Sequence, residues 1–179
     1  FAKKLQQNGF QVLAFDLRGH GESQGGPLGY KNFSDAKHQA SYYDIEAAEK
    51  FLRKKGVTRI NCAGASIGAN LALWYCSRHA EVVSAILLSA GIDYRGIKTE
   101  PCMQNIKEGQ AIYFVGSLED ERSSGVSAAE VAKRLFALCR GKKELREFDG
   151  AGHGTTMLER NPDFMDVLAA WVVDQNRDL

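Results

Sequence analysis

The 179-residue chain lacks the features that would direct it to nucleic acid, to a membrane or to a metal ion. Its formal net charge is only +1, so no global field favours nucleic acid or an anionic surface. It has no long basic run, and no apolar stretch long enough to span a membrane. The cysteines are scattered without zinc-type spacing; they are Cys62, Cys76, Cys102 and Cys139. We expect reduced core thiols in a cytoplasmic protein that binds neither metal nor cofactor.

The sequence also lacks internal repeats, low-complexity segments and interdomain linkers, and its expected strands and helices alternate. Strands are expected at residues 10–15, 58–63, 84–89, 110–115 and 143–148, and helices at 35–54, 67–78, 127–139 and 161–174. For the last helix we expect Asn161 as N-cap and Pro162 as the first residue. Such alternation predicts one α/β domain over residues 1–179, with a mostly parallel sheet covered by helices on both faces.

Residues 64–68 read Gly-Ala-Ser-Ile-Gly and carry the strongest functional signal. A segment that reads as a buried strand precedes them, and an apolar segment typical of a buried helix follows. A serine between glycines on such a turn is typical of the nucleophile elbow of serine hydrolases, because the turn strains the serine backbone and leaves no room for side chains at the flanking positions. Ser66 is therefore the candidate nucleophile. The simpler alternative is a glycine-rich turn with a helix-capping serine.

A serine nucleophile needs a base, and imidazole is the usual one because it titrates near working pH. His153 stands in a Gly-Ala-Gly-His-Gly segment just after the last expected strand. The glycines leave room for the imidazole to reach across to another loop. His38 and His79 lie on or near helix ends, and His20 is expected to shape the pocket. The alternative for His153 is a histidine in a flexible turn.

The base in turn needs a carboxylate that fixes its tautomer. The fourth expected strand runs into an acidic loop, in which Asp120 is the preferred candidate. Glu119 is the alternative that a shift in the loop would select, and Asp93, after the preceding strand, is a third. An acidic loop is also compatible with a merely solvated turn. The chain order of Ser66, Asp120 and His153 matches α/β-hydrolases and not the chymotrypsin or subtilisin arrangements.

Two further segments resemble the α/β-hydrolase superfamily, and the resemblance covers nearly the whole chain. Residues 16–23 are similar to the superfamily's Asp-x-Arg-Gly-His-Gly-x-Ser loop, which has a mainly structural role beside the active site. Residues 88–96 are similar to cap-less esterases of the dienelactone-hydrolase-like or lysophospholipase-like kind. In those relatives the acid follows in a Ser-x-Glu-Asp loop, so the resemblance supports Asp120. Only about twenty residues lie where many relatives insert a lid, so no lid domain is expected.

The resemblance also implies an incomplete oxyanion hole. One donor is the N–H of Ile67; the family's second donor follows a strand, in a His-Gly loop that this sequence does not contain. In the family that strand lies between those expected here at 10–15 and 58–63. The chain also begins at Phe1, so we expect an N-terminal part to be missing. Whether that part includes a signal peptide stays open. The isolated piece should then be poorly stable and nearly inactive. The alternative is that the two strands pair directly.

The leading hypothesis is a serine hydrolase that cleaves small carboxylic esters through an acyl-enzyme on Ser66. Amide or thioester hydrolysis by the same triad is the closest alternative, because these reactions share the acyl-enzyme. A non-catalytic binding protein on the same fold is the alternative from another class. The expected partner is a small-molecule ester, with no nucleic acid and no membrane span. The identity of the substrate and the oligomeric state stay open.

Overall fold

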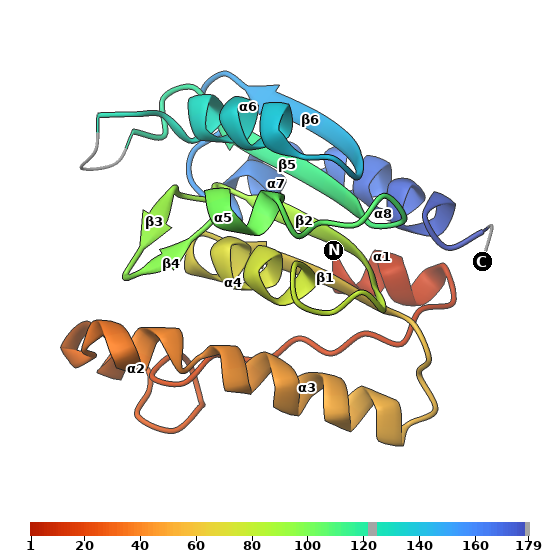
Figure 1. Cartoon of the computed structure of the whole chain (residues 1–179), viewed down its shortest axis with the longest axis horizontal. Helices are drawn as coiled ribbons and strands as arrows, with labels where there is room; N and C mark the ends of the chain where they lie inside the picture. The colour runs from red at the N-terminus through yellow and green to blue at the C-terminus, as the bar shows by residue number, and fades with distance from the viewer. Residues whose placement is uncertain (122–124, 178–179) are drawn as a thin grey trace. The chain divides into compact units, whose positions relative to one another are not determined.

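In the computed structural model, the chain forms two compact units, Phe1–Thr58 and Arg59–Leu179. The structure describes residues 1–121 and 125–177. The second unit contains the main sheet, and the first consists of helices and loops (Figure 1). All three candidate catalytic residues belong to the second unit.

The second unit is built on a four-stranded parallel sheet in the order β1-β2-β5-β6. The strands are β1 (Ile60–Ala65), β2 (Val82–Leu88), β5 (Ala111–Ser117) and β6 (Lys142–Phe148). Every residue of β2 and β5 is buried, whereas β6 alternates between more and less exposed residues. This pattern fits the topology, because central strands of a parallel sheet are covered on both faces and an edge strand is less enclosed.

Helices cover both faces of this sheet. The longest are α4 (Ile67–Cys76), α6 (Ala128–Leu138) and α8 (Phe164–Asp174). In β5, Tyr113 makes an edge-to-face contact with Trp171 of α8, and the next residue, Phe114, makes one with Phe136 of α6. Successive strand residues point to opposite faces. Therefore α6 and α8 lie on opposite sides of the sheet (Figure 1).

The helix α4 lies on the same face as α6. Gly64, Leu87 and Phe114 form one row across the sheet, and a Cβ on Gly64 would meet the carbonyl group of Gly68 in α4. Crossovers between parallel strands are right-handed, and the chain moves across the sheet in one direction from β1 to β6. The helix between β1 and β2, α4, and the helix between β5 and β6, α6, therefore lie on the same face. The parallel sheet with helices on both faces confirms the predicted α/β architecture.

Two short strands and a one-turn helix connect β2 to β5: β3 (Asp93–Tyr94), β4 (Ile97–Lys98) and α5 (Glu100–Met103). Arg95 and Gly96 have φ angles of 54° and 82°, as a two-residue type I′ turn requires. The buried Asn70 side chain of α4 donates to the Gly91 and Ile97 carbonyls and accepts from the Gly91 N–H. The sequence does not predict this hairpin, since two-residue strands show no alternation.

The prediction that Asn161 caps the last helix is wrong. The helix α8 begins at Phe164 with Asp163 as its N-cap, because the chain turns first, with the Phe164 N–H donating to the Asn161 carbonyl at 3.0 Å. The Asn161 amide donates to the Met157 carbonyl in α7 (Thr156–Arg160). Asn161 therefore closes α7, a helix that the sequence analysis does not predict, instead of opening α8.

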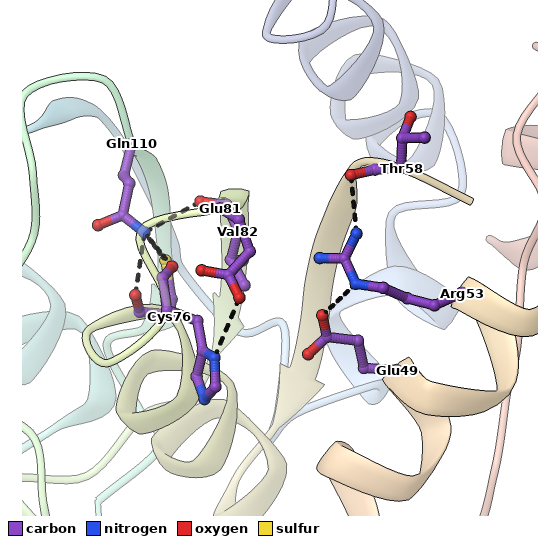
Figure 2. A network of polar contacts seen from close by, with 8 residues as sticks. Glu49, Arg53, Thr58, Cys76, Glu81, Val82 and Gln110 are labelled. Atoms are coloured by element: carbon purple, nitrogen blue, oxygen red, sulfur yellow. Dashed lines mark hydrogen bonds and ion pairs between the residues drawn. The ribbon is translucent and has the colours of Figure 1, made fainter. Parts of the chain in front are cut away.

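Gln110 joins the end of α4 to the start of β2 through its side chain (Figure 2). Its buried amide nitrogen lies 2.9 Å from the Cys76 carbonyl and 3.0 Å from those of His79 and Val82, which share its two hydrogens. Its oxygen accepts from the Lys107 N–H at 3.0 Å. The last carbonyls of a helix have no partner within the helix. This glutamine adds side-chain hydrogen bonds to the segment between α4 and β2, in which the Cys76 and His79 carbonyls also accept from the N–H groups of His79 and Val82.

The four cysteines, all in the described part of the chain, form no disulfide. Cys76, Cys102 and Cys139 are buried, and burial raises the pKa of each thiol above its ordinary value. The three buried thiols agree with the expectation of core cysteines, whereas Cys62 is only half-buried. Separately, none of the described helices combines the length and the apolar character needed to cross a membrane.

The first unit, all of whose residues the structure describes, contains no strand. Its elements are α1 (Ala2–Gln7), a 3-10 helix (Gly29–Asn32), α2 (Asp35–Gln39) and α3 (Tyr42–Lys54). The strand predicted at 10–15 is therefore wrong, because those residues have no ladder partner and a strand exists only through bonds to a neighbour. The single helix predicted at 35–54 is also wrong. The helix is interrupted between α2 and α3, where the Ser41 N–H donates to the carbonyl of His38, three residues back, as in a 3-10 turn.

The Asp-x-Arg-Gly-His-Gly-x-Ser loop of the first unit folds back on itself. The Asp16 carboxylate accepts from the Glu22 N–H at 3.0 Å, and its carbonyl accepts from the Ser23 hydroxyl at 2.6 Å. Arg18 forms a 2.7 Å ion pair with Asp44 of α3, and this hydrogen-bonded partner raises the pKa of the guanidinium. These contacts hold the loop together and to α3, and the mainly structural role that the resemblance implies stays a prediction.

Candidate active site

Ser66, Asp120 and His153 each follow the carboxyl end of a parallel strand. Ser66 comes directly after β1, Asp120 lies in the loop after β5, and His153 lies in the loop after β6. The carboxyl ends of parallel strands meet at one edge of the sheet, which is where open α/β sheets place their sites. The fold therefore brings three loops that are distant in sequence to the same edge.

The Ser66 and His153 loops approach each other at the end of β2. The Ser66 N–H donates to the last carbonyl of β2, and the Gly154 N–H donates to the hydroxyl of the next residue, Ser89, both at 2.9 Å. A Cβ on Gly154 would lie 3.3 Å from the Cβ of Ala65. The residue after His153 thus packs against the residue before Ser66.

The Ser66 backbone has the strained conformation of a tight strand-to-helix turn, with φ 55° and ψ −120°. A Cβ on Gly64 would collide with the carbonyl group of Gly68, so only glycine fits at residue 64. Gly68 departs from the expectation, because a Cβ there would meet no atom within 4 Å. Ile67 is the first residue of α4, where an N–H has no partner within the helix and the helix dipole is positive.

The His153 imidazole is held by Asp120. Its Nδ1 lies 2.9 Å and 2.7 Å from the carboxylate oxygens Oδ1 and Oδ2. A carboxylate only accepts hydrogen bonds, so Nδ1 carries a proton, and Nε2 is the nitrogen that can take a further one. The Asp120 side chain is 6% exposed and that of His153 is 36% exposed. A buried acid therefore orients a base that is partly open to solvent.

Glu119, the neighbouring acid considered from the sequence, binds the backbone of the same loop. Its carboxylate accepts from the Ser117 hydroxyl at 2.6 Å and from the N–H groups of Gly150 and Gly152. These bonds, led by the one from Ser117, lower the pKa of Glu119 to about 2. The imidazole contact itself is made by Asp120.

Asp93, the third acid considered from the sequence, is used within its own hairpin. Its Oδ1 accepts from the Gly96 N–H at 2.7 Å, and the residue is exposed. This bond closes the turn between β3 and β4. Among the three acids, the structure places Asp120 on the imidazole of His153.

The sequence of residues 1–129 matches the family described as the alpha/beta hydrolase fold. The chain belongs to the α/β-hydrolase family. Its fold is similar to that of the Pyrococcus furiosus esterase Pf2001, with a TM-score of 0.74 and 19% identity over 96% of this chain and 74% of that one. An α-β serine hydrolase homologue from Coxiella burnetii has a TM-score of 0.70 and 19% identity, over 94% and 72% of the two chains.

A third similar structure is the Pyrococcus horikoshii acylaminoacyl peptidase, with a TM-score of 0.55 and 16% identity over 71% of this chain and 27% of that one. At such identities the likeness shows the fold. Among curated proteins, no sequence matches the chain. The family match and these folds confirm the α/β-hydrolase resemblance and the predicted fold class.

The other histidines of this α/β hydrolase have local packing partners. His20 stacks on Tyr30 and His79 stacks on Tyr75, with ring centroids 4.3 Å and 4.1 Å apart. His38 is buried. The role in shaping the pocket that the sequence analysis expects of His20 stays a prediction.

The side chains that hold the His153 loop of this α/β hydrolase are not predicted in that role from the sequence. Ser89, Ser117 and Glu119 accept hydrogen bonds from backbone N–H groups of this loop. The available signal is the placement of the two buried serines: Ser117 is the last residue of β5, and Ser89 directly follows β2. A buried hydroxyl is costly without a partner, so such serines indicate polar contacts at this edge.

Proposed function

We propose that the protein is a serine hydrolase that cleaves carboxylic esters through an acyl-enzyme on Ser66. The observation that carries the proposal is the Asp120 carboxylate on Nδ1 of His153, at the sheet edge where Ser66 lies on a strained turn. Serine, imidazole and carboxylate in this chain order are the groups that acyl transfer requires in α/β-hydrolases.

The reaction starts when Ser66 Oγ attacks the acyl carbon and His153 Nε2 takes the hydroxyl proton. The Ile67 N–H stabilises the tetrahedral oxyanion. His153 then returns the proton to the leaving oxygen, so that an alcohol departs and an acyl-serine remains. Water attacks this acyl-enzyme while His153 removes its proton, and the carboxylic acid leaves as Ser66 regains its hydrogen. Asp120 stays ionised and orients the imidazole throughout.

Ester hydrolysis is the first choice because the fold is similar to that of an esterase, Pf2001. Amide hydrolysis is the second candidate, since the fold also resembles that of an acylaminoacyl peptidase; thioesters form the same acyl-enzyme. The connection between β2 and β5 contains only the β3–β4 hairpin and α5 as regular elements in the described chain. So short a connection favours small, soluble substrates over lipid interfaces.

A fluorophosphonate probe and p-nitrophenyl acetate test the proposal in the complete protein, including the N-terminal part that the sequence leads us to expect. We expect the label on Ser66, and we expect Ser66→Ala to abolish labelling and to lower turnover by more than about 10⁴-fold. Ser77→Ala is the matched control, because Ser77 lies at the other end of α4 and its hydroxyl donates to the Trp74 carbonyl. It should keep both label and turnover.

Two outcomes would contradict the proposal. Unchanged turnover in Ser66→Ala would remove Ser66 from the reaction. A folded complete protein that takes no label would favour a non-catalytic binding protein on this fold.

A further inference from the structure

The loop that carries His153 is tied to the rest of the sheet through its backbone. Four of its N–H groups donate to side chains at the ends of other strands. The pairs are Gly150 and Gly152 with the Glu119 carboxylate, Ala151 with the Ser117 hydroxyl, and Gly154 with the Ser89 hydroxyl. The three acceptors, Glu119, Ser117 and Ser89, are called the amide clamp below.

Glu119 is the centre of the amide clamp. It accepts two loop N–H groups and the Ser117 hydroxyl, which in turn accepts from the Ala151 N–H at 3.1 Å. Gly150 and Gly152 have φ angles of 70° and 81°, and successive N–H groups in such turns form concavities that bind anions. Because these bonds lower the pKa of Glu119 to about 2, the carboxylate is ionised at neutral pH.

The glycines of this loop make such support necessary. Glycine has no side chain with which to pack and loses the most conformational freedom on folding. The sequence places glycine at residues 150, 152 and 154, so only Ala151 and His153 between them can anchor the loop by packing. Hydrogen bonds to the backbone therefore hold it instead.

We propose that Glu119 is a positioning residue for His153, an inference that rests on the proposed function. Glu119 and Asp120 are neighbours, and they bind the His153 loop at two levels, since Glu119 binds its backbone and Asp120 binds its imidazole. One short segment thereby fixes both the loop and the ring. Proton transfer from Ser66 depends on that placement, because a displacement of about 1 Å can cost on the order of 100-fold in rate.

Three variants of the complete protein separate the hydrogen bonds of Glu119 from its charge. Glu119→Gln keeps the shape but presents an NH₂ group to N–H donors, and Glu119→Asp keeps the charge on a shorter side chain. Glu121→Gln removes one charge from the same loop and leaves the amide clamp intact. Glu119 is exposed, so its replacement opens no core cavity, and thermal unfolding verifies that each variant is folded.

We expect kcat for p-nitrophenyl acetate to fall about 10- to 100-fold in both Glu119 variants, with KM within about twofold of wild type. Glu121→Gln should stay within about twofold of wild type in both constants. A Glu119→Asp variant with wild-type kcat would overturn the proposal, because charge alone would then suffice.

Proton NMR tests the positioning role without turnover. The Nδ1–H of His153, held by Asp120, should give a low-field resonance in the wild type and in Glu121→Gln. We expect this resonance to broaden or disappear in both Glu119 variants. Lost turnover with an unchanged resonance would overturn the proposal. If the wild type takes no fluorophosphonate label, the proposed function fails, whereas the resonance still decides whether Glu119 holds His153.

Discussion

Gly154 packs directly against Ala65, since a Cβ on Gly154 would lie 3.3 Å from the Ala65 Cβ. Ala65 precedes Ser66 and Gly154 follows His153, so we expect this contact to set how closely the proposed nucleophile and base approach each other. Gly154 also has a φ of 58°, in a region that side-chain-bearing residues rarely adopt.

Gly154→Ala should therefore affect both stability and activity. Backbone strain should lower the free energy of unfolding by about 1–2 kcal/mol, and the added methyl group should push the loop away from Ala65 and lower kcat. Gly109→Ala is the control, because a Cβ there meets no atom within 4 Å and φ is not in the left-handed region. Urea unfolding and ester turnover measure the two effects. Wild-type turnover in Gly154→Ala would show that this contact does not set the approach.

The two glycines of the elbow should respond differently to alanine, although the sequence motif treats them alike. Gly64→Ala places a methyl group on the Gly68 carbonyl and should cost about 3 kcal/mol or prevent folding. Gly68→Ala adds a methyl group in open space in the first turn of α4 and should change stability by less than about 1 kcal/mol. Denaturant unfolding of both variants checks this, and equal losses would contradict it.

Asp120→Asn tests which acid serves the imidazole. Asparagine keeps the shape of the side chain but allows the wrong imidazole tautomer, so kcat should fall by about 10⁴-fold. Asp93→Asn is the matched control, since Asp93 binds the Gly96 N–H of its own hairpin, and it should keep most of the turnover. Steady-state kinetics at one pH compare the two variants. A larger loss in Asp93→Asn would reassign the acid.

The pKa of Glu119 predicts how acid affects the His153 loop. Its pKa is lowered from 4.5 to about 2 on folding, so its contribution to stability is complete above about pH 4.5 and is lost as the pH falls through about 2. The difference in unfolding free energy between wild type and Glu119→Gln should thus be constant near neutral pH and shrink between about pH 4.5 and about pH 2. Urea unfolding over this range measures it. A difference that already shrinks between pH 7 and pH 5 would argue against these bonds.

Local patterns predicted the central strands well because burial leaves a direct record in the sequence. The strand expected at 84–89 is β2 and the one at 110–115 is β5, each shifted by no more than two residues. Residues 10–15 carry a similar apolar pattern, yet they form no strand. Apolar periodicity reports burial and not the presence of a hydrogen-bonding partner, which only the arrangement of the chain supplies.

The sequence by itself determined the candidates, since residue type, glycine spacing and chain order single out Ser66, Asp120 and His153. Tertiary structure alone decided that Asp120 and not Glu119 contacts the imidazole. The side chains of Glu119 and Asp120 are oriented by hydrogen bonds to the His153 loop, which lies about thirty residues further along the chain. Local sequence patterns carry no information on contacts at that separation. For the same reason, only the structure shows that Gly64 is sterically required and Gly68 is not, because close approach is a property of packed elements and not of a motif.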